Sequence, residues 1–420
     1  MSFKEKLFGI GNKMQAENAT LREALVEQSK VRFKDDVLDN GVTRLVHNHA
    51  VNKAKLGVEI LNLSKHTYNK RIAEAVEAGV IGEHYVYNKA HMYTLDQVHA
   101  LMEYFGFEKY SDHFEPKVVS VQNYKGGTGK STTTISLAIK TALDLDLNAR
   151  VLIVDLDPQG SAARGLITLE NENEAVYLTA ADLLCAEFEP EGEVAGYIQQ
   201  GYTFEQIVSA SPFRTHIPNL SVLTAFPTDE KFTDTYWALN DEDAQSKFLQ
   251  RFAQEILPIL KQDFDVIYLD LPPQNSPITW SALEAADMVL APITPRTYDY
   301  TSTTSYILTL AEMCDSLPSA GKNVQWFKIL PVNYNEKDKQ EKKIYNRLLR
   351  TVGSDLIPKP IVHSPLFLEV AEMNRSIYDI TKSESTCTSI QFDEAVSSVN
   401  AVYNSFIDEL KVLASKGVEE

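Results

Sequence analysis

One stretch of the chain combines a lysine, clustered glycines and hydroxyl side chains in an order that suits a bound phosphate. Residues 118–138 read VVSVQNYKGGTGKSTTTISLA, which is an apolar strand, a glycine-rich turn and the start of a helix. The glycines let the backbone curl so that its N–H groups face an anion, and the N-terminus of the helix adds a partial positive charge. Lys130 can reach the β- and γ-phosphates of a nucleotide, and the Ser131 hydroxyl can ligate Mg²⁺. The predicted phosphate loop consists of Gly126, Gly127, Thr128, Gly129, Lys130, Ser131 and Thr132.

Two further apolar segments end in carboxylates. Residues 151–161 read VLIVDLDPQGS, with Asp155 and Asp157 one residue apart, and residues 264–273 read FDVIYLDLPP, a Walker B candidate. Asp270 would end a buried strand of the second segment, where it can hold Mg²⁺ through water. Side chains alternate along a strand, so only one of Asp155 and Asp157 can point at the phosphates unless the strand has already turned. Taken alone, the first segment is better explained by an ordinary Asp-Pro turn that ends a strand.

The phosphate loop departs from the ordinary Walker A pattern at its first position. Tyr124 stands where that pattern has glycine, and Lys125 opens the loop as KGGTGKST. This sequence resembles the deviant Walker A motif of the ParA/MinD/nitrogenase-iron-protein group. Residues 279–292, and Asp299 with residues 301–303, also resemble the ParA family. The resemblance thus covers most of the chain from residue 117 to about residue 380, and a merely flexible Gly-rich turn is discounted.

The resemblance implies an ATPase with ATP or ADP and Mg²⁺ as cofactors. In that family the extra lysine, here Lys125, reaches across a nucleotide-sandwich dimer to the partner's phosphates, like an arginine finger. Asp157 would orient the attacking water, and Asp155 would support the Mg²⁺ and phosphate-loop network. Asn333 follows a late strand where this family contacts the adenine, although an Asn that caps a loop fits as well. The implied catalytic residues are Lys125, Lys130 and Asp157, and the implied metal-binding residues are Ser131, Asp155 and Asp270.

The segment 41–112 has the pattern of a small DNA-binding module. Ser64 is a good N-cap for a helix over residues 64–78, a short turn precedes it, and residues 85–93 suggest a wing before a helix that Thr94 caps. This order resembles a winged helix-turn-helix of the MerR kind, with residues 64–78 as recognition helix. The segment is locally basic, and we predict DNA contacts by Lys65, Lys70 and Arg71. The alternative is a helical bundle whose basic residues are only solvated.

A second group of basic residues lies late in the chain. Lys343, Arg347 and Arg350 can share one face of a helix, although a plain solvated helix is the default interpretation of such a run and these residues are secondary candidates. Arg375 lies where ParA-type proteins carry residues for sequence-independent DNA binding. We predict that these four residues contact DNA phosphates, with Arg375 as the strongest candidate.

The chain is long enough for two or three domains. It has 420 residues. We expect a helix within residues 1–40 as a possible dimerisation arm, the helix-turn-helix domain over 41–112, and one α/β domain over 113–420. Apolar runs alternate with helical stretches after residue 116, which predicts a mainly parallel sheet with helices on both faces. The expected strands are 118–122, 151–155, 220–226, 266–270, 288–293 and 326–333.

Composition narrows the remaining choices. Lys and Arg number 40 against 58 Asp and Glu, and the formal net charge is −18. This negative total argues against DNA as a partner, because phosphate contacts need positive surface. Counted by segment, however, the predicted DNA-binding module is basic, and much of the acidic surplus lies between Glu170 and Glu193. Three scattered cysteines, no signal peptide and no membrane-length apolar run favour a cytoplasmic protein, which the resemblance would place on the nucleoid.

The leading hypothesis is a partition ATPase of the larger ParA form, which segregates a plasmid or chromosome. It would dimerise with ATP, assemble on non-specific DNA, hydrolyse ATP when a ParB-like centromere-binding partner stimulates it, and possibly bind an operator as an autorepressor. A MinD-like membrane-positioning ATPase is an alternative, but it needs a basic amphipathic C-terminal helix, and this C-terminus carries more acid than base. Iron–sulfur electron transfer is a further alternative, but the three cysteines of the chain do not form a recognisable cluster-binding pattern. A nucleotide-gated repressor without turnover is disfavoured by Asp157.

Overall fold

The computed structural model describes residues 40–160 and 178–416, together with residues 37, 38 and 166 and scattered positions between 4 and 13. The helix expected within residues 1–40 falls largely outside the described residues, and so do Glu170, Glu172 and Glu174 of the acidic stretch.

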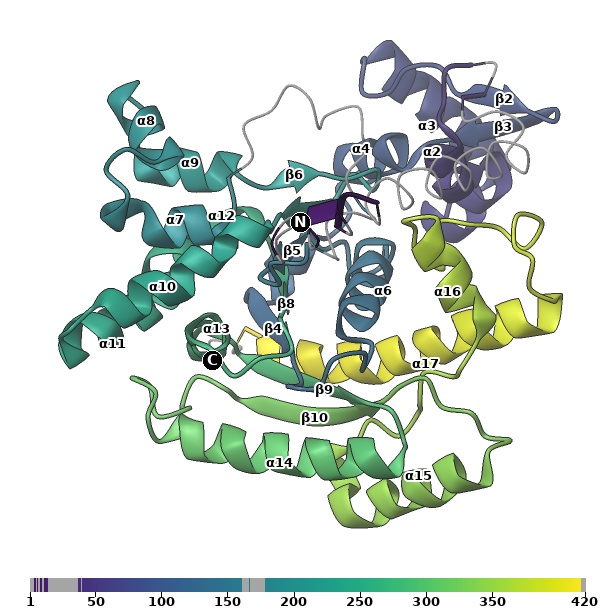
Figure 1. The fold of residues 1–420 in the computed structure, drawn as a ribbon. Helices are drawn as coiled ribbons and strands as arrows, with labels where there is room; N and C mark the ends of the chain where they lie inside the picture. The colour runs from purple at the N-terminus through teal and green to yellow at the C-terminus, as the bar shows by residue number, and fades with distance from the viewer. Residues whose placement is uncertain are drawn as a thin grey trace.

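A seven-stranded sheet forms the centre of the molecule (Figure 1). Its order is β10-β9-β4-β8-β5-β7-β6, and every neighbouring pair is parallel except β6 with β7. All six expected strands are present, which confirms the mainly parallel α/β fold. The strands are β4 (Lys117–Val121), β5 (Val151–Asp155), β6 (Phe213–Arg214), β7 (Leu220–Leu223), β8 (Val266–Asp270), β9 (Met288–Ile293) and β10 (Trp326–Pro331).

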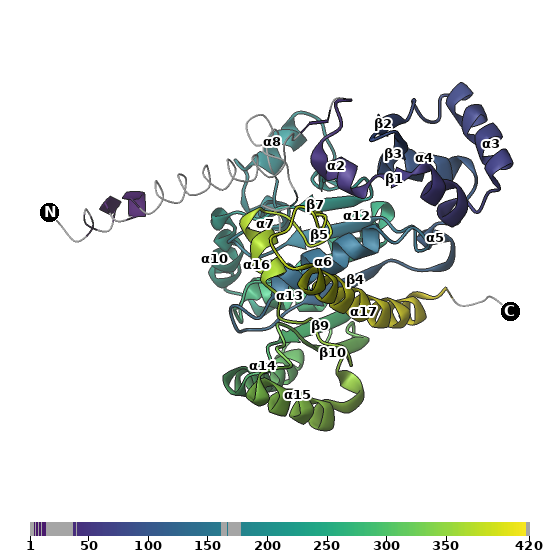
Figure 2. The ribbon, with the colours of Figure 1, turned by 90° about the vertical axis from the view of Figure 1, so that its right-hand side faces the viewer.

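Helices cover both faces of this sheet, because successive residues of each strand point to opposite sides. In β8, Val266 and Tyr268 pack into one apolar core, whereas Ile267 and Leu269 pack into the other. Figure 2 shows α17 lying alongside α6 on the first face. The helices of this face are α6 (Lys130–Ala142), α16 (Pro365–Glu372) and α17 (Ser389–Ala414), and those of the second include α12 (Leu257–Asp263) and α13 (Pro277–Ala285).

Two further groups of helices extend the domain. The first packs into the core of the second face and consists of α7 (Ala180–Cys185), α8 (Glu193–Gln199), α9 (Phe204–Ala210), α10 (Lys231–Ala238) and α11 (Glu242–Arg251). Its acidic residues are partly neutralised, because Lys231 pairs with Asp182 and Glu189, and Arg251 pairs with Glu187. The second group packs against β9 and β10 and consists of α14 (Thr297–Cys314) and α15 (Lys339–Val352).

The N-terminal module has its own apolar core, built around Leu56, Tyr68, Val98 and Leu101. The expected helices and the strands of the expected wing are present. Ser64 caps α3, because its hydroxyl accepts a hydrogen bond from the Thr67 N–H. The elements are α2 (Arg44–His49), β1 (Val51–Asn52), a helical turn (Lys55–Ile60), α3 (Lys65–Glu77), β2 (Tyr85–Tyr87), β3 (Ala90–Tyr93), α4 (Leu95–Tyr104) and α5 (Tyr110–His113). The three short strands form an antiparallel sheet in the order β1-β3-β2.

The C-terminal helix α17 is a core element of the α/β domain. It buries Phe392, Val399, Val402, Phe406 and Leu410 against the first face of the sheet. Among the described residues, no helix combines the length and the apolar character that crossing a membrane requires.

Candidate nucleotide site

The phosphate loop joins the fully buried strand β4 to the N-terminus of α6. Two of its glycines have left-handed backbones, with φ of 72° at Gly127 and 75° at Gly129, a conformation that L side chains rarely adopt. Gly129 is the N-cap of α6, so the first N–H groups of the helix face the space above the loop. The loop therefore has the backbone form of an anion cradle, as predicted.

Lys130 lies under this loop. Only 7% of the residue is exposed, and its Nζ donates to the Lys125 carbonyl oxygen at 3.3 Å. Burial lowers the pKa of Lys130, and the negative charges of Asp270 and Asp157 oppose that shift. A buried, pre-organised ammonium can donate charge-assisted hydrogen bonds to an anionic ligand such as a phosphate chain.

Asp270 ends β8 beside Asp155, which is its register partner at the end of β5. Its Oδ1 accepts from the Thr134 hydroxyl at 3.1 Å, and the Ser131 hydroxyl also hydrogen-bonds this carboxyl group. Its Oδ2 is buried with no hydrogen-bond partner among the residues described. Burial raises the pKa of Asp270 to about 6, although the hydrogen bonds from Ser131 and Thr134 lower it.

Asp155 and Asp157 both reach the site because the chain turns directly after β5. The Asp157 N–H donates to Asp155 Oδ1 at 3.1 Å, and the Gln159 N–H donates to Asp157 Oδ1 at 3.0 Å. Both aspartates are buried, and the charge of Asp157 acts on Lys130 and Asp270. Along a continuing strand, only one of the two carboxylates could face the phosphates; because the chain has already turned at Asp157, both can.

The donor set at these strand ends fits a magnesium ion. It offers carboxylate oxygens from Asp155 and Asp270 and a hydroxyl from Ser131, and Mg²⁺ prefers oxygen ligands. The unpartnered Oδ2 of Asp270 is the sharpest sign, since a buried carboxylate oxygen without a partner is costly.

Lys125 lies at the outer end of the loop and forms an ion pair with Asp299 in the first turn of α14. The Lys125 side chain is 36% exposed and the Asp299 side chain is 8% exposed. Asn123 fixes the backbone here, because its Oδ1 accepts from the Lys125 N–H and its Nδ2 donates to the Pro292 carbonyl oxygen. Sequence reasoning singled out Asp299 but did not predict this pair, and no spacing signal connects residues so far apart.

The remaining predicted nucleotide contacts differ in their surroundings. The Thr128 hydroxyl donates to the Lys125 carbonyl oxygen at 3.3 Å, whereas Gly126 and Thr132 are exposed. Asn333 is exposed just beyond β10, and its Oδ1 is 2.7 Å from His363 Nδ1. The neighbouring Val332 side chain packs close to Gly129, which keeps Asn333 near the loop. Its contact with the adenine stays a prediction, as does the alternative of a capping role.

The basic residues predicted to contact DNA lie on two separate helices. Lys65, Lys70 and Arg71 are exposed on α3; Lys70 is 3.8 Å from Glu74, and the Arg71 guanidinium lies 5.4 Å from the centre of the Phe105 ring. Lys343, Arg347 and Arg350 are exposed on α15, and Arg347 stacks over the Tyr300 ring at 4.2 Å. Arg375 differs, because it is only partly exposed and its Nη1 is out of contact with solvent.

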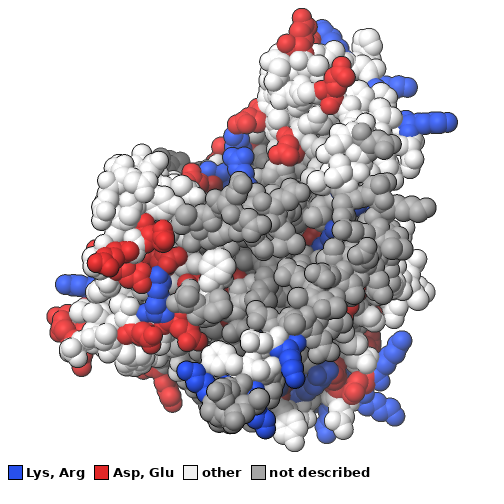
Figure 3. Space-filling model, turned by 45° about the horizontal axis from the view of Figure 1, so that its top comes forward, with Lys and Arg blue, Asp and Glu red and all other residues white. Residues whose placement is uncertain are grey.

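The charges divide over one face of the molecule. Figure 3 shows acidic side chains gathered over the α7–α11 helices, and lysines and arginines along the edge that carries α14 and α15. The charged side chains are therefore unevenly spread over this face of the molecule.

Comparison with known proteins agrees with this geometry. Residues 116–320 match a family described as an AAA domain. A replication protein A of Rhizobium rhizogenes is 25% identical over 339 residues, covering 77% of this chain and 78% of that protein. Plasmid partition protein A of Escherichia coli is 24% identical over 270 residues, covering 63% and 64% respectively.

The fold agrees as well. A solved structure described as a partition protein superposes with a TM-score of 0.56 at 19% identity, covering 89% of this chain and 97% of that one. The relatives, the fold and the deviant phosphate loop agree with one another: the chain is similar to the ParA-type P-loop ATPases.

Proposed function

We propose that this protein is a DNA-partition ATPase that binds ATP with Mg²⁺, dimerises in the ATP state and hydrolyses ATP when a ParB-like partner stimulates it. The observation that carries this proposal is the pair of lysines in one loop: Lys130 is buried in the field of Asp157 and Asp270, and Lys125 is partly exposed at the loop's outer end. Mg²⁺ would act as a Lewis acid and stabilise negative charge on the phosphates. Asp270, Asp155 and Ser131 would hold the ion.

Asp157 would orient the attacking water. It is buried beside Lys130, and its carboxylate is fixed by the Gln159 N–H, so it could accept a hydrogen bond from a water next to the phosphates. Replacing Asp157 with Ala should leave ATP binding intact and abolish stimulated turnover. Turnover at the wild-type rate in this variant would remove the role.

Non-specific DNA is the proposed surface on which the ATP-bound dimer assembles. Support comes from the exposed basic face of α15, where Lys343, Arg347 and Arg350 lie within two turns of one another. Removing all three charges should weaken binding to random-sequence DNA. The slope of the logarithm of the binding constant against the logarithm of the salt concentration should become less steep by roughly three. Lys342→Gln is the matched control on the same helix, because Lys342 is exposed and pairs with Glu336.

Arg375 has a separate test because it is less exposed than the α15 residues. Arg375→Ala should weaken DNA retention and spare nucleotide binding. Retention that is unchanged across a salt series would remove Arg375 from the DNA surface while leaving the α15 proposal intact.

The N-terminal module is the proposed reader of an operator, which would make the protein an autorepressor. Its α3 buries Tyr68, Ile72 and Ala75 and exposes Lys65 and Lys70, with Lys70 on the side opposite the buried residues, as a recognition helix would. Substituting Lys65 and Lys70 with Gln should abolish a footprint on the operator but leave ATP hydrolysis unchanged. A retained footprint would show that another surface reads the operator.

A cytoplasmic, nucleoid-bound location follows from this proposal. A MinD-like membrane role is disfavoured, because the apolar face of α17 is buried in the core on one side of the sheet. The test of the whole proposal is ATP hydrolysis measured with random DNA and a ParB-like protein, added separately and together. Stimulation by the two together is the expected result.

A further inference from the structure

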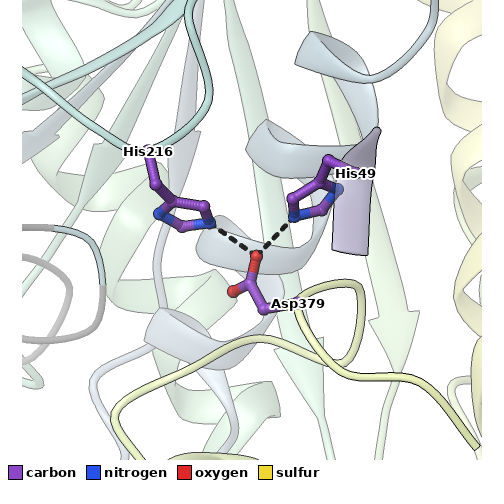
Figure 4. A group of neighbouring side chains, drawn as sticks. All are labelled: His49, His216 and Asp379. Carbon is purple, nitrogen blue, oxygen red and sulfur yellow. Dashed lines mark hydrogen bonds and ion pairs between the residues drawn. The ribbon is translucent and has the colours of Figure 1, made fainter. Parts of the chain in front are cut away.

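Three ligand-type side chains meet where the N-terminal module contacts the ATPase domain (Figure 4). His49 ends α2, His216 lies between β6 and β7, and Asp379 lies between α16 and α17. Both imidazole Nε2 atoms approach the same carboxylate oxygen, Asp379 Oδ1, at 2.8 Å from His49 and 2.6 Å from His216. The Asp379 side chain is fully buried, and those of His49 and His216 are 5% and 4% exposed.

The surroundings hold Asp379 in a fixed orientation. Its Oδ2 accepts from the Ser376 N–H at 2.8 Å, which leaves Oδ1 for the two imidazoles. Asn48 Nδ2 donates to the Asp379 carbonyl oxygen and to Glu384 Oε2, and Glu384 in turn pairs with Arg44. Burial alone would raise the pKa of Asp379, but the charges and hydrogen bonds of His216 and His49 bring it well below its ordinary value.

This arrangement has the composition and size of a metal centre. The three ligand atoms all lie within 4.8 Å of one another. Zinc–nitrogen and zinc–oxygen bonds of about 2.0–2.2 Å in a tetrahedral site set the ligand atoms about 3.4 Å apart. An ion between the side chains therefore requires each imidazole Nε2 to move less than an ångström away from Asp379 Oδ1, relative to the present hydrogen-bonded distances. Two imidazoles and one carboxylate are ligands that suit zinc and similar divalent transition ions.

A second observation points the same way. Asn48 Oδ1 is buried and has no hydrogen-bond partner among the described residues, although its Nδ2 is 2.7 Å from the Asp379 backbone. The residue next to His49 thus carries a buried amide oxygen that accepts no hydrogen bond and could serve as a metal ligand. The hydrogen-bonded arrangement also requires both imidazoles to carry their proton on Nε2, and a divalent ion would replace both protons.

We propose that His49, His216 and Asp379 bind one zinc-class divalent ion that fastens the N-terminal module to the ATPase domain. His49 belongs to the module, whereas His216 and Asp379 belong to the ATPase domain, so the ion cross-links segments more than 150 residues apart in the chain. The near-complete burial of all three side chains favours a structural role for the ion. It is separate from the nucleotide site.

Metal binding to the full-length wild-type chain is the first measurement. The metal-free protein is titrated with Zn²⁺ against a chromophoric chelator, and with Co²⁺ followed by visible absorption. We expect one equivalent of Zn²⁺, a tetrahedral Co²⁺ spectrum and a higher thermal unfolding midpoint with Zn²⁺. A wild-type chain that takes up no Zn²⁺, or gives only the spectrum of hydrated Co²⁺, would overturn the proposal.

Variants locate the bound ion. His216→Gln should weaken Zn²⁺ binding by at least about 10-fold and abolish the Co²⁺ spectrum, since it removes one of three ligands. His91→Gln is the matched control, because the His91 and His84 rings stack with centres 4.1 Å apart on the module surface and form another close histidine pair. Binding lost in His91→Gln and kept in His216→Gln would place the ion elsewhere and contradict the proposal.

Discussion

The two lysines of the phosphate loop differ more than their five-residue separation suggests. Lys130 is buried, touches the loop backbone and lies in the field of Asp157 and Asp270. Lys125 is partly exposed and is held by Asp299, which belongs to a different helix. Lys130, the inner lysine, is therefore part of the site of its own chain. Lys125, the outer lysine, lies at the edge of that site in a partly exposed ion pair that can break.

This difference gives a physical reason for a loop with two lysines. A cation that must act on the phosphates of the same chain is best buried and pre-organised. A cation that must act on another chain has to be exposed and must have a resting partner when that chain is absent. Asp299 fills the second requirement in the single chain.

Lys130→Gln should have the largest effect. It removes the buried charge that faces the phosphates, so basal and stimulated ATP hydrolysis should both fall by about 10³-fold or more, together with nucleotide affinity. Fluorescent-nucleotide binding and phosphate release measure the two losses. Hydrolysis that persisted at the wild-type rate would mean that Lys130 does not contact the phosphates.

Lys125→Gln should affect only what depends on a second chain. Stimulated hydrolysis should fall by on the order of 10²–10³-fold, as for a lost arginine finger, while nucleotide binding to the single chain stays near wild type. Lys322→Gln is the control, since Lys322 is an exposed lysine on the turn after α14. Equal losses of nucleotide binding in Lys125→Gln and Lys130→Gln would erase the distinction between the two lysines.

Asp299→Asn should act in the opposite direction and more weakly. It frees Lys125 from an ion pair that is partly exposed, and such pairs contribute up to about 1 kcal/mol. The ATP concentration needed for half-maximal dimerisation should fall by about 2–5-fold, as measured by light scattering. A rise in that concentration would show that Asp299 positions Lys125 for the partner instead of holding it back.

Thr134→Val should have the smallest effect on activity and a measurable one on stability. It removes the hydroxyl that donates to buried Asp270, at a cost of about 1–2 kcal/mol in the free energy of unfolding. Urea denaturation without nucleotide measures this cost. Asp299→Asn, at the exposed lysine, should lose less than half as much, and the reverse order would contradict the assignment of the two environments.

The loop and the strands around it could be predicted because contiguous residues encode them. Residues 118–138 hold a buried strand, two left-handed glycines and a helix start in one run, and the carboxylates at 155, 157 and 270 end apolar strands. Parallel strands bring such ends to one edge of a sheet, so the site assembles as soon as the topology is right.

Contacts between distant residues could not be predicted in this way. The pair of Lys125 with Asp299, and the cluster of His49, His216 and Asp379, join segments that only the tertiary fold brings together. Charge counting was also incomplete, because it could not foresee that Lys231 and Arg251 neutralise part of the acidic elaboration or that Arg375 is partly buried.

Mixing two inactive variants tests the central claim most directly. Asp157→Ala lacks the water-orienting carboxylate and Lys125→Gln lacks the outer lysine, so neither should hydrolyse ATP when stimulated alone. In a mixed dimer, the site of the Lys125→Gln chain keeps its own Lys130 and Asp157 and receives Lys125 from the partner. The equimolar mixture should therefore recover about a quarter of the wild-type stimulated rate, as expected for a cation that acts in trans. A mixture that dimerises with ATP but stays as inactive as each variant alone would show that Lys125 acts within its own chain.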